Sequence, residues 1–341
     1  MPRNFLAGVG LALAIALSVS GSTASARSTL IARNLAVLEH RAGPDAAGLL
    51  RASPSLGWGV VENDWPSSAA GLLAAEASAG RKANLVETYV HWGEWSAFSY
   101  VRTGILATLQ RGSTPVITWM SDDPSGGSQA VFDLRAIASG AWDLYARSWA
   151  DGLRALRSPV MLRLDSEMNG NWMTYSPGFG GNGTTAADFV AAWRHLHDIF
   201  RAEGATNVSW VWSPNIEYPG SQPLRALYPG DSYVDWVALD GYNWGTTYGH
   251  VWQSFGEVFD SSIAAVERLT WRPFMIAETA SAEAGGDKAA WITGMFSELA
   301  SRRDIRGFIW FDLNKETDWR IASTPASAVA FRAGLGRLPT P

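Results

Sequence analysis

Residues 159–172 read PVMLRLDSEMNGNW, and the fold of the chain can be inferred from this stretch and the residues that follow it. Its first six residues form a nearly continuous apolar run, which is typical of a strand buried on both faces of a parallel sheet. Residues 185–203 have the apolar spacing of a helix, and a second apolar run, NVSWVW, follows at 207–212. A strand, a helix and a second strand in this order predict a βαβ unit.

The same alternation extends over most of the chain. We expect strands at 56–61, 84–90, 115–119, 159–164, 207–212, 233–239, 273–277 and 307–311. Helical spacing is found at 66–79, 98–111, 130–157, 185–203, 251–270 and 287–303, with shorter pieces at 221–227 and 325–334. This pattern predicts an α/β fold, a single (β/α)8 TIM barrel. An open doubly wound sheet is the alternative, but no strand is followed by the glycine-rich phosphate turn that such sheets often use.

The amino-terminal residues have the pattern of a secretory signal peptide. Arg3 supplies a positive charge, residues 5–19 form an apolar run, and residues 24–26 (Ala-Ser-Ala) are a small-x-small cleavage motif. The run is too short to span a bilayer comfortably. We therefore expect a cleaved leader at 1–26, a helical extension packed on the barrel at 27–55, and the barrel at 56–341. The mature protein would be secreted or periplasmic, with no membrane contact.

The composition of the 341-residue chain excludes several classes of protein. Its 27 basic and 32 acidic residues give a net charge of −5, and no basic cluster suggests nucleic-acid binding. The absence of cysteine excludes disulfides and thiolate metal sites. Tryptophan is in excess, with 18 residues against 13 phenylalanines, which favours stacking on flat ligands such as sugars. Nothing in the sequence requires an oligomer, so a monomer is expected.

Acidic side chains follow the predicted strands at their carboxyl ends, where barrel enzymes place their reactive groups. Glu167 follows the fourth strand and Glu278 follows the seventh, and these strands lie nearly opposite each other in an eight-stranded barrel. Because strand side chains alternate, Arg163, Asp165 and Glu167 would share one face if the strand extends that far. Cleavage of a glycosidic bond by two carboxylates needs one protonated and one ionised, on either side of the bond.

The sequence does not suggest a cofactor or a metal. His195 and His197 are two apart on a predicted helix, so they face different sides and cannot chelate one ion together. No His-Glu-x-x-His zinc helix and no Gly-x-Ser-x-Gly nucleophile elbow occur. We therefore expect a site made of side chains alone.

A set of motifs around these acids resembles glycoside hydrolase family 26. The resemblance covers residues 56–333, and its motifs lie at 167–172, 192–195, 199–200, 207–215, 228–231, 234–236, 240–244, 275–279 and 309–311. The resemblance implies that Glu167 is the general acid/base and Glu278 the nucleophile of a retaining double displacement. Retention would place the two carboxyl groups about 5–5.5 Å apart.

The resemblance also implies a set of substrate-binding residues. Tyr242 would hydrogen-bond the nucleophile, and Trp172 and Trp310 would form aromatic walls around the sugar at the cleavage point. The full set expected in the cleft is His91, Trp119, Arg163, Asn169, Trp172, Trp212, Asp235, Asp240, Tyr242, Trp244 and Trp310.

One position departs from the family pattern and bears on the substrate. The family usually has histidine directly before the acid/base, whereas this chain has Ser166, preceded by Asp165. The change removes a polar partner for the sugar, and an inward Asp165 would add a like charge beside Glu167.

The resemblance implies an endo-acting hydrolase of a β-linked polysaccharide, and β-1,4-mannan is the first expected substrate. A β-1,3-1,4-glucanase or exopolysaccharide glycanase of the same family is an alternative. A carbohydrate-binding barrel without catalysis is another.

Overall fold

The structure is a computed structural model that describes residues 56–61, 65–93, 97–124 and 129–339. The predicted leader and the extension up to residue 55 lie outside the described residues. Eight parallel strands form a closed barrel in chain order, which confirms the predicted (β/α)8 fold. The strands are β1 Gly57–Val61, β2 Leu85–His91, β3 Thr114–Met120, β4 Val160–Leu164, β5 Val208–Trp212, β6 Trp236–Asn243, β7 Phe274–Ser281 and β8 Ile305–Phe311.

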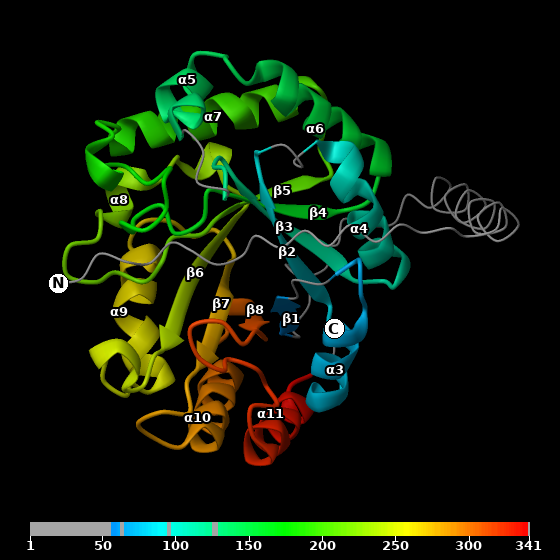
Figure 1. The fold of residues 1–341 in the computed structure, drawn as a ribbon, viewed down its shortest axis with the longest axis vertical. Coiled ribbons are helices and arrows are strands. Elements are labelled where there is room, and N and C mark those ends of the chain that lie inside the picture. The colour runs from blue at the N-terminus through cyan, green and yellow to red at the C-terminus, as the bar shows by residue number, and fades with distance from the viewer. Residues whose placement is uncertain (1–55, 62–64, 94–96, 125–128, 340–341) are drawn as a thin grey trace, which may run out of the picture. The chain divides into compact units, whose positions relative to one another are not determined.

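The helices surround the strands, as Figure 1 shows. They are α3 Ala70–Ala79, α4 Phe98–Gln110, α5 Leu134–Ala138, α6 Asp143–Leu156, α7 Ala186–Ala202, α8 Leu224–Leu227, α9 Phe255–Glu267, α10 Lys288–Ser301 and α11 Pro325–Arg337. The single helix predicted at 130–157 is wrong, because the chain breaks between α5 and α6 at Gly140, whose φ is 96°. Among the described residues, no helix has both the length and the apolar character needed to cross a membrane.

Local sequence signals set where two of the helices begin. Thr185 caps α7 and Ser254 caps α9, and in each case the carboxylate of the acidic residue three positions later accepts from the backbone N–H of the cap residue. This reciprocal capping box satisfies backbone N–H groups that have no partner within the helix. The two helices therefore start close to the residues that the sequence predicted.

Strands β6 and β7 each extend four residues beyond the predicted strand ends. The polar residues at these ends suggested a loop, but they remain paired, and all of them are buried except Tyr242, which is half-buried. The register shifts between Leu239 and Asp240, so that Asp240 pairs with Glu278. A bulge of this kind re-aims the side chains that follow it. It sets Asp240 of β6 beside Glu278 of β7.

Three tryptophans predicted in the cleft lie instead between the barrel and its helices. Trp119, Trp212 and Trp310 are fully buried. Trp119 packs against Trp149 of α6 at a centroid distance of 5.1 Å, and Trp310 packs against Phe331 of α11 at 5.1 Å. Alternate residues of a barrel strand point away from the axis, and these three occupy such positions. They belong to the hydrophobic core and do not line the cleft.

Candidate active site

Arg163 of β4 lies inside the barrel and connects three acidic side chains. It is fully buried. Its Nη1 donates to Glu87 of β2 and to Oε1 of Glu278 (3.0 Å), and its Nη2 donates to Oδ2 of Asp240 (2.5 Å). A buried guanidinium without such partners would be strongly destabilising. The arginine therefore fixes carboxylates from three different strands around one point.

Glu278 has a donor on each carboxylate oxygen. Its Oε1 accepts from Arg163, and its Oε2 accepts from the hydroxyl of Tyr242 at 2.6 Å. The side chain is only 8% exposed. Donors aimed at both oxygens stabilise the negative charge and fix the direction in which the carboxylate points. These are the requirements of an attacking carboxylate.

Glu167 lies just beyond β4 and has a different environment. Its Oε1 accepts from Nδ2 of Asn215 (2.8 Å), and its Oε2 accepts from Nε1 of Trp172 (2.6 Å). Burial, and next the negative charge of Glu278, raise the pKa of Glu167 to about 6. A carboxyl group with such a pKa can release a proton and take one up again close to neutral pH.

The backbone that carries Glu167 is not a continuation of the strand. β4 ends at Leu164, and both Asp165 (φ 44°) and Glu167 (φ 57°) have left-handed backbone conformations. The strand therefore does not extend far enough for Arg163, Asp165 and Glu167 to share one face. Asp165 points to β3, where it accepts from the amide (2.7 Å) and hydroxyl (2.8 Å) of Ser121, and burial raises its pKa to about 7. Left-handed non-glycine residues often cluster at functional sites.

An aromatic surface flanks Glu167. Trp172 is 43% exposed, and its ring stacks on Tyr218 at a centroid distance of 5.6 Å. The indole lies over Gly170, where an added Cβ would come within 2.7 Å of Trp172 Cζ2. Buried Asn169 exchanges two hydrogen bonds with the backbone of Asn215, so it positions one of the donors to Glu167.

A second aromatic group lies on the side of Glu278. Tyr242 is 6.1 Å from Trp244 and 5.1 Å from Trp319, centroid to centroid. Near the ends of β2 and β3, Nδ1 of His91 is 2.6 Å from a carboxylate oxygen of Asp122, and the imidazole is 32% exposed. His91, Tyr242 and Trp244 thus remain at least partly accessible, as a ligand-binding role requires.

The structure distributes the other predicted residues differently. Asp235 precedes β6 and accepts from the backbone amide of Trp210, so it lies at the amino end of the strand, away from Glu278. Arg163 and Asp240 are fully buried, which lets them support the carboxylates without reaching a ligand. Asp235 is thus not a cleft residue.

Sequence reasoning missed three residues of the site. Asn215 lies three residues after the end of β5, and this position near a strand end was the available signal. Glu87 of β2 is fully buried beside Arg163, and burial raises its pKa to about 7. Trp319 belongs to the segment after β8, which carries no periodic pattern. Among the described residues, no three His, Asp or Glu side chains are grouped as metal ligands.

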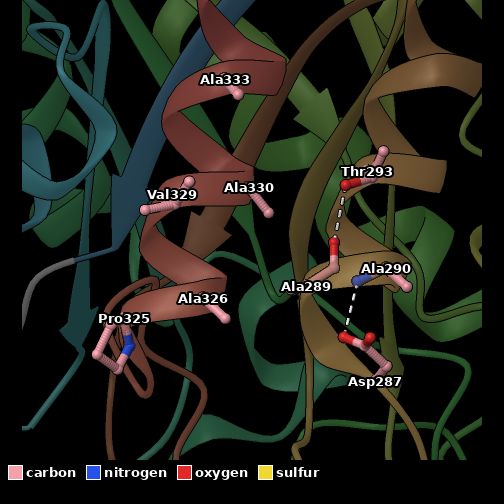
Figure 2. Close-up of a pocket in the computed structure, with 9 residues that line it drawn as sticks. All are labelled: Asp287, Ala289, Ala290, Thr293, Pro325, Ala326, Val329, Ala330 and Ala333. Carbon is pink, nitrogen blue, oxygen red and sulfur yellow. Dashed lines mark hydrogen bonds between the residues drawn. The ribbon is translucent and has the colours of Figure 1, made fainter.

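A hollow on the outside of the barrel, between α10 and α11, contrasts with this site. Figure 2 shows that its lining consists mostly of small side chains. The one ionisable residue in the lining, Asp287, caps α10 by accepting from the amide of Ala290 (2.9 Å). This hollow contains no pair of acidic side chains comparable to Glu167, just beyond β4, and Glu278 of β7.

Residues 135–301, which include Glu167 and Glu278, match the family model described as glycosyl hydrolase family 26. The chain belongs to glycoside hydrolase family 26. Among curated relatives, endoglucanase H of Acetivibrio thermocellus is 39% identical over 261 residues, which is 75% of this chain and 28% of that protein. The mannan endo-1,4-beta-mannosidase A and B of Caldalkalibacillus mannanilyticus is 32% identical over 126 residues, or 35% of this chain and 24% of that protein. The chain thus spans only about a quarter of the length of these two relatives.

Solved structures of family 26 members share the barrel. GH26A from Muricauda sp. aligns with a TM-score of 0.60 and 18% identity over 86% of this chain and 94% of that one. Bacillus subtilis mannanase man26 aligns with a TM-score of 0.58 and 18% identity over 88% of each chain. At this identity the likeness shows a common fold.

Proposed function

We propose that this family 26 protein cleaves internal bonds of a β-linked polysaccharide by a retaining double displacement. The observation that carries the proposal is the contrast between its two acids. Both acids accept a hydrogen bond on each oxygen, but one donor to Glu278 is the charged guanidinium of Arg163. Both donors to Glu167 are neutral, and its pKa is raised to about 6. One group suits attack, and the other suits proton transfer.

In the first step, Glu278 attacks the anomeric carbon while Glu167 protonates the leaving glycosidic oxygen. A covalent glycosyl–enzyme forms and the leaving chain departs. In the second step, Glu167 takes a proton from water as the water oxygen attacks the anomeric carbon from the face that the leaving chain vacated, opposite Glu278, and the bond between Glu278 and that carbon breaks. Two inversions at the anomeric carbon give a product of retained β configuration.

We infer that a β-glucan is a better first substrate than the β-1,4-mannan expected from the sequence. The relative that aligns over 75% of the chain is named an endoglucanase, whereas the named mannanase aligns over 35%. The position before Glu167 is Ser166, which is buried, and its carbonyl accepts from Tyr175 (2.7 Å). A small residue here fits a change of sugar preference within the family. Mannan remains the second candidate.

The test is release of reducing ends from mixed-linkage glucan, carboxymethyl cellulose, mannan, glucomannan and β-1,3-xylan. We expect Glu278→Gln to lower kcat by about 10³-fold or more, in line with the loss of a catalytic nucleophile. Glu267→Gln, an exposed change at the end of α9, is the matched control and should leave kcat unaltered. Normal turnover by the Glu278 variant, or an α-anomer as first product in NMR, contradicts the mechanism. Measurable binding without turnover by the wild type would favour a carbohydrate-binding barrel.

A further inference from the structure

Lys288, the first residue of α10, is a buried lysine outside the carboxylate cluster. It is 1% exposed. Its Nζ donates to the carbonyl oxygens of Asp318 (3.1 Å) and Arg320 (2.9 Å) and to the hydroxyl of Ser323 (2.8 Å). All three acceptors lie in one segment, residues 312–324, between β8 and α11. An ammonium group has three N–H donors. All three donors of Lys288 are thus used to bind this one segment to the start of α10.

The position of this ammonium group is unfavourable in itself. A positive charge in the first turn opposes the dipole of the helix. Figure 2 shows this end of α10 beside the start of α11. Burial lowers the pKa of Lys288 to about 8; the facing charges of Glu283, Asp312 and Asp318 oppose the shift, and that of Arg320 adds to it. The three hydrogen bonds to the segment offset these unfavourable terms.

The segment that Lys288 closes also contacts the nucleophile's partner. Trp319, in the middle of the segment, is 1% exposed, and its carbonyl accepts from Nε1 of Trp310 at 2.9 Å. Its ring packs against Tyr242 at a centroid distance of 5.1 Å. The hydroxyl of Tyr242 donates to Glu278 at 2.6 Å. Direct contacts therefore run from the segment to the carboxylate.

We propose that Lys288 is a positioning residue for the nucleophile: it holds the segment 312–324 so that Trp319 keeps the Tyr242 hydroxyl on Glu278. The inference rests on the proposed function, since it assumes that Glu278 attacks the sugar. Loss of the ammonium removes this donor from the carbonyl of Asp318 and leaves the carbonyl of Arg320 with the amide of Ser323, so that the segment loses its hydrogen bonds to the first residue of α10 and can shift. The step that suffers is attack by Glu278, so kcat falls and KM changes little.

The activity test compares Lys288→Met and Lys288→Arg with Lys82→Met, an exposed lysine before β2 that serves as control. We expect kcat of the methionine variant to fall about tenfold or more at pH 7, the scale of a small misplacement of a reacting group, with KM within about twofold. The arginine variant, which keeps the charge and the donors, should recover at least a third of wild-type kcat. A folded methionine variant with kcat within twofold of wild type overturns the proposal. So does an equal fall in both variants.

A second measurement does not depend on turnover. The indole N–H signal of Trp319, assigned by its loss in Trp319→Phe, should shift in Lys288→Met and stay in place in Lys82→Met. In the wild type it should move with an apparent pKa near 8, the value given by burial of Lys288, and in Lys288→Arg this titration should vanish. If the wild type cleaves none of the glycans, the proposed function fails, and this signal alone decides the role of Lys288. An unmoved signal in Lys288→Met overturns that role.

A milder variant protects the test against misfolding of Lys288→Met. Ser323→Ala removes one of the three acceptors and leaves the lysine in place. We expect kcat to fall about threefold and the Trp319 signal to shift in the same direction, but less. Wild-type kcat together with an unmoved signal in this variant overturns the proposal.

Discussion

Replacement of Trp172 by phenylalanine should raise the pH at which activity is lost. Because kcat/KM reports the pKa of the free enzyme, we expect its alkaline half-point in the wild type near pH 6, the pKa of Glu167. The indole N–H donates to Glu167 at 2.6 Å and stabilises the ionised form. Its removal therefore favours the protonated form and moves the half-point upwards.

The size of this shift follows from the exposure of the donor. A hydrogen bond to a charged group contributes about 1.5–3 kcal/mol. Trp172 is 43% exposed, so water replaces part of the lost interaction, and we take the lower end of the range. One pKa unit corresponds to about 1.4 kcal/mol, which moves the half-point to about pH 7.

The assay is kcat/KM from pH 4 to 9 on the best substrate of the panel. Tyr218→Phe is the matched control, since it keeps the ring that stacks on Trp172 and both donors to Glu167. Its half-point should equal that of the wild type. A half-point in Trp172→Phe that is unchanged or lower would refute the assignment of Glu167 as the proton donor.

Three further variants test the supporting structure. Arg163→Met leaves buried carboxylates unpaired and should lower the free energy of unfolding by about 3–5 kcal/mol in urea denaturation; an unaltered unfolding curve would contradict the role of this arginine. The pKa of Asp165 is raised to about 7, so wild-type stability should fall, relative to Asp165→Asn, by up to about 4 kcal/mol as the pH rises from 4 to 8. If the free energy of unfolding of the two proteins changes with pH in the same way, the carboxyl group of Asp165 does not have a raised pKa in the folded protein. Trp310→Phe should lower the melting temperature but change KM less than twofold, because Trp310 is a core residue. A large rise in KM would indicate that Trp310 contacts the substrate after all.

Only part of the candidate site could be predicted from the sequence. Strand ends marked Glu167 and Glu278 because the carboxyl ends of parallel strands meet at one end of a barrel. The same reasoning could not tell which tryptophans near those ends point inwards. Trp172, on a loop, is exposed, whereas Trp310, on a strand, is buried against α11. Successive side chains of a strand point alternately into the barrel and out towards the helices. Which tryptophans point inwards therefore depends on where each strand ends and on whether it contains a bulge.

Backbone conformation decided two further details. Asp165 and Glu167 would share one face only if the strand continued to residue 167, but β4 ends at Leu164, and with left-handed φ angles Asp165 contacts Ser121 while Glu167 lies beside Asn215. Residue type gives little signal of these conformations: aspartate is enriched among left-handed residues but adopts the conformation at only a small fraction of positions, and for glutamate the surrounding structure must impose it.

The barrel, the family resemblance and the two acids near the carboxyl ends of the fourth and seventh strands could all be predicted from the chain, because hydrophobic periodicity and motif order are properties of the sequence alone. Only the tertiary structure decided how those acids differ. Their protonation and direction depend on Arg163, Tyr242 and Asn215, which come from three other places in the chain and meet the acids only when the barrel closes. Desolvation and charge–charge interaction act through space, and no local pattern of residues encodes them.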